Sequence, residues 1–220
     1  MPVTRPNVLK WAPVIDAELA RVNSPFPRDL ILAVIDVESK GKAGLLNPKS
    51  GASGLMQVMP GTLEDYNKRH PSDPVSLAEL RSSSAPAAVK QIRVGLSVLS
   101  HYWRGAYDYL SDRWSHVPID ELARVADLFY VAGPGNTRDR LNMMDNPTWG
   151  AIQARFPKWN ALPHPRNVFS LLEGLTWPTE QIAAWLDSSP SKLAPSPKQG
   201  LFLSMLAILA AWWMMKGRKG

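Results

Sequence analysis

Apolar residues recur at three- and four-residue intervals along most of the chain, which is the spacing of one face of an α-helix. Clusters of Pro, Gly and Ser separate these stretches, and no segment alternates apolar and polar residues as a half-buried strand does. We therefore predict a mainly helical protein. The predicted helices cover residues 8–22, 29–39, 62–70, 85–109, 119–132 and 147–156.

One carboxylate lies where the helical pattern calls for an apolar side chain. Residues 29–40 read DLILAVIDVESK, and i, i+3, i+4, i+7 spacing puts four of them on one helical face: Ile31, Val34, Ile35 and Glu38. A carboxyl on such a face is expected to lose water, and desolvation favours the neutral form that can donate a proton. The alternative is a Glu38 turned to the helix edge and paired with Lys40 or Lys42.

A loop rich in small residues follows Glu38. Residues 41–54 read GKAGLLNPKSGASG, and the chain continues as LMQVMPGT. The glycines permit close backbone approach and positive φ angles. Met56 and Met59 offer adaptable apolar surfaces, and Gln57 offers an amide that donates and accepts hydrogen bonds. This composition suits an amphipathic sugar ring.

Together with Glu38 and Ser39, the stretch NPKSGASGLMQVMPGT resembles the soluble lytic transglycosylases, the goose-type-lysozyme-like enzymes that cleave the glycan strands of peptidoglycan. Two further segments support the resemblance. QIRVGLSVL, at residues 91–99, looks like the family's Asn-Ile-x-x-Gly-x-x-Tyr-Leu helix, and LFYVAGPGN, at residues 128–136, looks like its Ala-Tyr-Asn-Ala-Gly motif. The resemblance covers about residues 27–165 and implies a lysozyme-like lytic transglycosylase domain, which we place at residues 1–186.

The resemblance implies roles for individual residues. Glu38 matches the catalytic acid, and Tyr130 matches the phenol that hydrogen-bonds the catalytic carboxyl. The implied substrate-binding positions are Ser39, Gly54, Met56, Gln57, Ala132 and Gly133. The family motif has Asn after its tyrosine, whereas this chain has Val131, so any amide contact of that Asn to substrate is absent.

Most glycoside hydrolases place a second carboxylate opposite the acid. Asp36 lies about 200° around the helix from Glu38, and Glu64 and Asp65 look like ordinary acidic residues at a helix start. With no second acid, the resemblance implies that Glu38 protonates the oxygen between N-acetylmuramic acid and N-acetylglucosamine and then deprotonates the muramic C6 hydroxyl. The product would be a 1,6-anhydro sugar. A lysozyme that uses water as acceptor and a non-catalytic peptidoglycan-binding protein are the alternatives.

Composition argues against several other kinds of site and partner. The 220-residue chain has no cysteine, so disulfide frameworks and thiolate metal sites are excluded. The four histidines, His70, His101, His116 and His164, lack metal-ligand spacing, and we expect no metal and no cofactor. The formal net charge of +6 favours approach to an anionic cell wall or membrane. No Lys/Arg run with interleaved aromatics indicates a nucleic-acid partner.

The end of the chain has a different character. Residues 187–199 are rich in Ser and Pro and are predicted to form a linker, and residues 200–216 are apolar on every face and end in basic residues. We predict a C-terminal transmembrane helix at 200–216. Its apolar stretch of about fifteen residues spans only about 23 Å of a ~30 Å hydrocarbon core, so a core or interfacial helix is the alternative.

The N-terminal segment contains Pro, Asp, Glu and Arg where a signal peptide needs a continuous apolar run. We therefore expect a single-pass protein held by its C-terminal helix, either in the membrane of a bacteriophage virion or in a bacterial envelope, facing the periplasm. Its expected partners are peptidoglycan, the membrane, and virion or envelope-complex proteins. A membrane-anchored assembly protein that uses the glycan-binding fold only as a scaffold is a further alternative.

Overall fold

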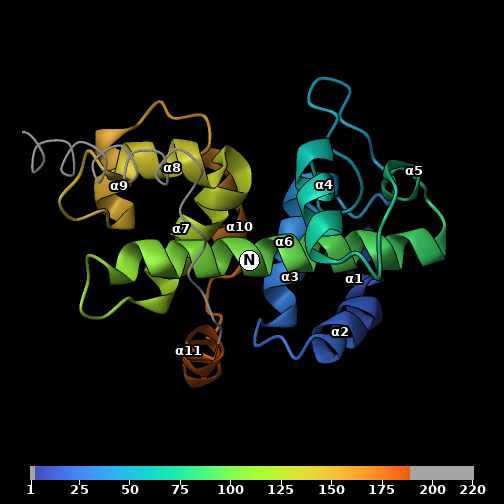
Figure 1. Cartoon of the computed structure of the whole chain (residues 1–220), viewed down its shortest axis with the longest axis horizontal. Coiled ribbons are helices and arrows are strands. Elements are labelled where there is room, and N and C mark those ends of the chain that lie inside the picture. The colour runs from blue at the N-terminus through green and yellow to red at the C-terminus, as the bar shows by residue number, and fades with distance from the viewer. Residues whose placement is uncertain (1–2, 189–220) are drawn as a thin grey trace, which may run out of the picture. The chain divides into compact units, whose positions relative to one another are not determined.

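The computed structural model describes residues 3–188, and the regular elements of this part are helices (Figure 1). They are α1 (Pro6–Leu9), α2 (Ala12–Arg21), α3 (Arg28–Ser39), α4 (Pro60–Arg69), α5 (Leu77–Leu80), α6 (Ala85–Ser111), α7 (Ile119–Ala132), α8 (Pro134–Leu141), α9 (Trp149–Arg155), α10 (Pro163–Leu171) and α11 (Thr179–Asp187). The prediction of a mainly helical protein is confirmed.

The predicted helices are present with one change. The stretch predicted at residues 8–22 is divided into α1 and α2, and Pro13 lies in the first turn of α2. Proline lacks a backbone N–H, so it is tolerated at a helix start but not in its interior. The pattern did not predict α5, α8, α10 or α11. The start of α10, Pro163-His164-Pro165, has the composition of a loop, although proline fits the first helical turn.

The long helix α6 organises the described residues. Helices α2, α4 and α5 pack along one part of it and α7 and α8 along another (Figure 1). Its interior side chains, including Ile92, Leu99 and Trp103, are buried in the main hydrophobic core. The same core contains the apolar face of α3, where Ile31 and Val34 are fully buried, so the predicted stripe is confirmed. Each such side chain stabilises the fold by about 1.5–3 kcal/mol.

A buried ion-pair network joins α2 to α6. The guanidinium of Arg93 contacts both carboxylate oxygens of Glu18, at 3.1 and 2.9 Å, and also reaches Asp73 at 2.8 Å. Arg21 adds a second cation, 2.7 Å from Glu18. Burial alone would raise the pKa of Glu18, but the hydrogen bonds and charges of Arg93 and Arg21 outweigh it and lower that pKa. Glu18 therefore stays charged inside the fold.

Helix α10 brings a later part of the chain to the earlier helices. It packs against both α3 and α7, with Pro165 and Val168 among its buried residues. This packing places the first turn of α10 beside the end of α3. That neighbourhood contains the acid singled out by the sequence.

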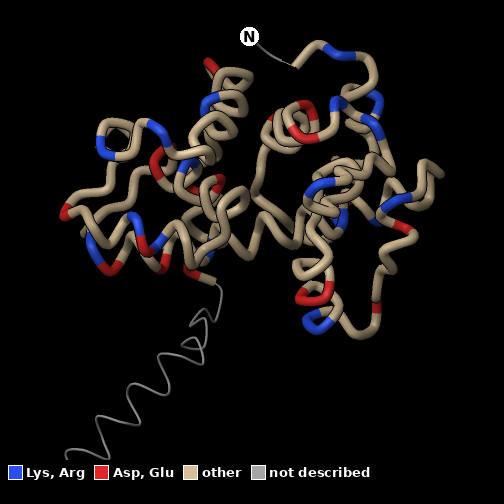
Figure 2. Tube along the Cα trace, turned by 90° about the horizontal axis from the view of Figure 1, so that it is seen from above, with Lys and Arg blue, Asp and Glu red and all other residues tan. Residues whose placement is uncertain are grey.

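Charged residues are distributed over the described helices with both signs interspersed (Figure 2). Among those helices, none has both the length and the apolar character needed to cross a membrane. The predicted linker falls outside the described residues except at its start, because α11 continues to Asp187. The predicted C-terminal helix at residues 200–216 lies outside them entirely.

Candidate active site

Glu38 lies in the last turn of α3, and the turn that follows it is fixed by backbone packing. The helix ends at Lys40, which adopts a left-handed conformation with φ 55°, and Gly41 follows with φ 75°. A Cβ on Gly41 would lie 2.2 Å from the carbonyl oxygen of Asn7, so only glycine fits here. The indole of Trp11 donates to the carbonyl oxygen of Gly41 at 3.0 Å. The contacts of Gly41 with Asn7 and Trp11 thus fix the turn that follows Glu38.

The carboxyl of Glu38 is mostly buried and is paired with a histidine. Its side chain is 18% exposed, and Oε1 lies 3.0 Å from Nε2 of His164, at the start of α10. The other ring nitrogen, Nδ1, lies 2.8 Å from Oδ2 of Asp127 on α7. The expected alternative, a pair with Lys40 or Lys42, is therefore replaced by a pair with His164.

His164 lies between two carboxylates, and this decides its charge. Burial would lower the pKa of the imidazole, but the hydrogen bond and charge of Asp127, followed by the close negative charge of Glu38, outweigh burial and raise the pKa to about 10. The ring therefore carries a positive charge at neutral pH, with a proton on each nitrogen. Nε2 is close to Glu38 without the alignment of a good hydrogen bond, so the contact is an ion pair.

Tyr130 lies one turn after Asp127 on α7 and stacks on the imidazole of His164, with ring centroids 6.3 Å apart and planes 25° apart. Its hydroxyl donates to the backbone carbonyl of Met56. Burial of the phenol, and then the negative charge of Glu38, raise the pKa of Tyr130 well above its usual value. A hydroxyl has one proton, so the predicted donation to the Glu38 carboxyl is not made in this arrangement.

The loop after Glu38 is held by Gln91 on α6. The amide oxygen of Gln91 accepts from the backbone N–H groups of Gly44, at 3.2 Å, and Leu55, at 3.0 Å. Its nitrogen donates to the carbonyl oxygens of Glu79 and Ser82. Two short antiparallel bridges, Leu46 with Ser53 and Ser53 with Val58, fold the loop on itself. Gln91 belongs to the predicted second motif, but its role in holding the loop was not predicted.

The predicted substrate-binding residues on this loop turn mainly inward. Gly54 is buried, and a Cβ there would lie 2.9 Å from Gln91. Met56 is 0% exposed and packs against Gly95, so its predicted sugar contact does not fit its position in the core. The more exposed methionine is Met59, at 43%. Long flexible apolar side chains fill cores as readily as they line sugar sites, which is why sequence alone did not separate the two.

Gln57 is strained and bonded within the loop. It has a left-handed φ of 46°, and its amide nitrogen donates to the carbonyl oxygens of Leu45, at 3.1 Å, and Gly54, at 3.0 Å. A bulky residue in this conformation costs of order 1–3 kcal/mol unless its surroundings hold it there, and such positions cluster at functional sites. A sugar contact by Gln57 would therefore use its amide oxygen and stays a prediction.

The remaining predicted positions differ in exposure. Ser39 is buried, and its hydroxyl donates to the carbonyl oxygen of Ile35 one turn earlier, so the predicted contact with substrate does not fit. Ala132 and Gly133, at the end of α7, are half-buried. Gly133 has φ 77°, and a Cβ there would meet no atom within 4 Å. Substrate contact at Ala132 and Gly133 stays a prediction.

With the geometry established, comparison with known proteins identifies the family. The family model described as "Transglycosylase SLT domain" matches residues 18–144, which is more than half of the chain. This chain belongs to the SLT family. No curated protein matches it. The family resemblance predicted from the motifs is confirmed, although the match begins earlier and ends earlier than the predicted 27–165.

The SLT match contains Glu38, Asp127 and Tyr130 but stops before His164. The sequence prediction missed both His164 and Asp127. Asp127 has a usable signal, since it is a carboxylate surrounded in sequence by buried apolar residues of α7, as Glu38 is on α3. His164 has none, because its neighbours are prolines outside every predicted helix and its partners come from two distant helices.

The other carboxylates considered as a second acid are engaged elsewhere or exposed. Asp36 is buried and pairs with Arg5 at 2.7 Å. Glu64 is exposed on α4. Asp65 is also exposed and lies 3.5 Å from Lys68. The structure therefore supports the interpretation that Glu64 and Asp65 are ordinary surface residues of the SLT domain.

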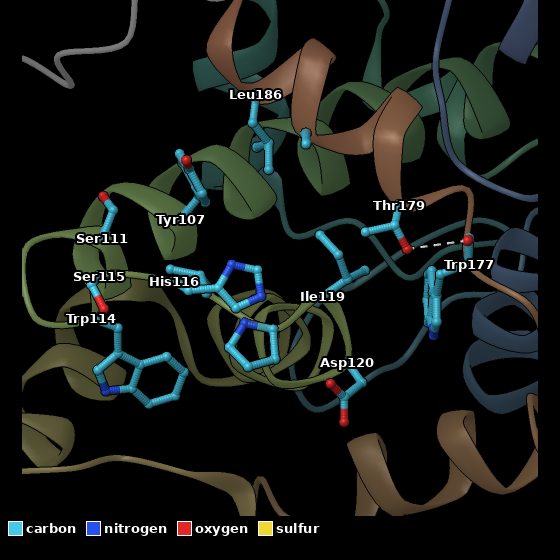
Figure 3. A pocket seen from close by; sticks show the side chains of 13 residues that line it. Tyr107, Ser111, Trp114, Ser115, His116, Ile119, Asp120, Trp177, Thr179 and Leu186 are labelled. Carbon is cyan, nitrogen blue, oxygen red and sulfur yellow. Dashed lines mark hydrogen bonds between the residues drawn. The ribbon is translucent and has the colours of Figure 1, made fainter.

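A cavity of about 560 Å³ opens elsewhere in the SLT-family chain, between parts of α6, α7 and α11 (Figure 3). Its lining includes Tyr107, Trp114, His116, Asp120 and Trp177, and it contains neither Glu38 nor any residue of the loop after it. Aromatic and polar side chains are mixed in it, but the carboxyl–imidazole cluster is not part of it. The candidate active site therefore does not coincide with this cavity.

Proposed function

We propose that this SLT-family protein is a peptidoglycan lytic transglycosylase. It would cleave the β-1,4 bond between N-acetylmuramic acid and N-acetylglucosamine and form the 1,6-anhydro product. Glu38 is the general acid and then the general base. The observation that carries the proposal is the carboxyl of Glu38 on the otherwise apolar face of α3, mostly buried yet 18% exposed, within the matched domain.

The surroundings of Glu38 support a mechanism with one acid. Asp127 is the carboxylate that contacts the same imidazole as Glu38. Its side chain is only 5% exposed, and the ring of His164 lies between it and Glu38. A buried carboxylate behind an imidazole is badly placed to activate water on the far side of a sugar ring, as an inverting enzyme requires. In the proposed reaction the substrate's own C6 hydroxyl takes the place of that water.

The reaction needs one proton and returns it. Glu38 gives its proton to the glycosidic oxygen as the bond to the muramic C1 breaks, and positive charge develops on the sugar. The resulting carboxylate removes the proton from the C6 hydroxyl as the C6 oxygen bonds to C1. Glu38 ends protonated, so the site is ready for the next bond.

The test is digestion of purified peptidoglycan by the full-length protein in detergent, with product analysis by mass spectrometry. We expect anhydromuropeptides from the native protein, none from Glu38→Gln, and native levels from Glu64→Gln, a matched change at an exposed glutamate. Products with reducing ends would show a lysozyme. Binding of peptidoglycan without cleavage by the native protein would show a non-catalytic binding protein.

On sequence grounds we also propose that residues 200–216 anchor the domain in a membrane, of a virion or of the bacterial envelope, so that wall cleavage is local. A vesicle flotation assay tests this. The full-length protein should float with vesicles, and Leu206→Lys combined with Leu209→Lys should leave it in the soluble fraction, because charges in the bilayer core are costly. Equal flotation of both proteins would contradict the anchor.

A further inference from the structure

His164 is held by groups from two other helices, and each contact restrains a different part of its ring. Asp127 on α7 holds Nδ1, Glu38 on α3 faces Nε2, and Tyr130 on α7 stacks against the ring plane. Its own backbone is restrained by Pro163 and Pro165, which lie on either side of it in the first turn of α10. The imidazole therefore has little freedom to turn away from Glu38.

The pair formed by Asp127 and His164 is more than a structural contact. Asp127 is almost fully buried, and a buried carboxylate is costly unless a charged partner hydrogen-bonds to it. His164 meets that need with Nδ1 alone. Its second N–H is buried and is directed toward the carboxyl that we propose as the acid, without a well-aligned acceptor in the unliganded site. Catalytic hydrogen bonds are often poorly aligned before substrate binds and tighten in the complex.

Building on the proposed function, we propose that His164 is a positioning residue for Glu38: Asp127 orients its ring, and the ring fixes Oε1 and stabilises the carboxylate formed once Glu38 has given up its proton. The proton passes from Glu38 to the leaving glycosidic oxygen and is replaced from the C6 hydroxyl. His164 keeps both of its protons throughout. The charge that stabilises the intermediate carboxylate is thus in place before the reaction begins.

This arrangement predicts a definite effect on the rate of cleavage. The titratable groups facing His164 from the helices packed against α10 are Glu38 on α3 and Asp127 and Tyr130 on α7. The positive charge of the ring stabilises the carboxylate that Glu38 becomes after it has given up its proton. Removing that charge should therefore slow the reaction without weakening the binding of substrate.

The experiment compares His164→Gln with His116→Gln, a matched change at an exposed histidine, in the full-length protein on purified peptidoglycan. For His164→Gln we expect kcat at the optimum to fall by about tenfold to a hundredfold, less than the ~10²–10³ typical of a lost oxyanion donor. We expect KM to change little. For His116→Gln we expect no change in kcat or KM.

Asp127→Asn separates orientation from charge. Its amide oxygen can still accept the hydrogen bond from Nδ1, but it no longer stabilises the charged ring, so kcat should again fall while KM changes little. If both variants fail to fold, nuclear magnetic resonance of the native protein with labelled histidine still tests the proposal. Both ring nitrogens of His164 should remain protonated between pH 6 and pH 9, and a neutral ring in that range would overturn the proposal.

The outcomes separate this inference from the proposed function. If the native protein forms no anhydro product, the proposed function fails. If the native protein is active and Glu38→Gln is inactive, while His164→Gln matches His116→Gln in kcat and KM, only the role of His164 is overturned.

Discussion

Two regions adjoin Glu38, the loop that follows it at residues 41–59 (the loop wall) and the helices α7 and α10 (the charged wall), and they are built by different means. The loop after α3 carries the most specific motif, yet its side chains are used mainly to hold the loop itself, through Gln57 within it and Gln91 behind it. The wall formed by α7 and α10 has weak sequence signals but contains the ion-paired cluster of Asp127 and His164. The comparison teaches that motif residues can hold the backbone of a candidate site in place while other helices supply its charged groups.

Among the substitutions that affect the loop wall, Gln91→Ala should lower the unfolding free energy most. Four backbone groups, one buried and three partly buried, would lose their partner, at up to about 1–3 kcal/mol each, with part of the loss offset by water that enters the space. We expect a loss of unfolding free energy of about 4 kcal/mol, measured by urea denaturation. A loss below about 1 kcal/mol would contradict this account of the loop.

Substitution of the two methionines of the loop should lower the unfolding free energy by very different amounts. Met56→Ala removes a fully buried side chain and should lower the unfolding free energy by about 3 kcal/mol. Met59→Ala removes an exposed one and should change it by less than about 0.5 kcal/mol. Denaturation curves for both variants give the comparison. Equal losses would show that Met56 is not a core residue.

The contact between the loop and α6 can be tested with a smaller change. In Gly95→Ala the new methyl group would lie 2.2 Å from the sulfur of Met56, so the side chain must move. Overpacking of this kind costs about 1–3 kcal/mol. The double variant with Met56→Ala should recover part of that loss, because the alanine leaves room for the methyl group. Additive losses in the thermodynamic cycle would argue against direct contact.

The charged wall is tested by the pH dependence of stability. The pKa of His164 is raised to about 10, so its contribution is fully present below its unfolded pKa near 6.5 and is lost as pH rises toward 10. Between these values the unfolding free energy should fall with pH, by at most about 1.4 kcal/mol per unit. Thermal unfolding across this range measures the slope. Its persistence in His164→Gln would assign it to another group.

The outcome of prediction differs between the two walls for a physical reason. Helical periodicity located α3, α6 and α7 and placed Glu38 on a buried face, because each of these signals lies within a few turns of one helix. The burial of Met56 was not predicted, since a methionine after a glycine-rich loop fits either side of it. The choice depended on the space above Gly95, which belongs to another helix.

The sequence by itself determined the helical class and the family and singled out Glu38 as the candidate acid, because these depend on local spacing and on a contiguous motif. Only the tertiary structure decided which side chains surround that acid. The pairing of Glu38 with His164 requires α10 to pack against both α3 and α7. Charge interactions act through space over a few ångströms, and no pattern along the chain records that distance.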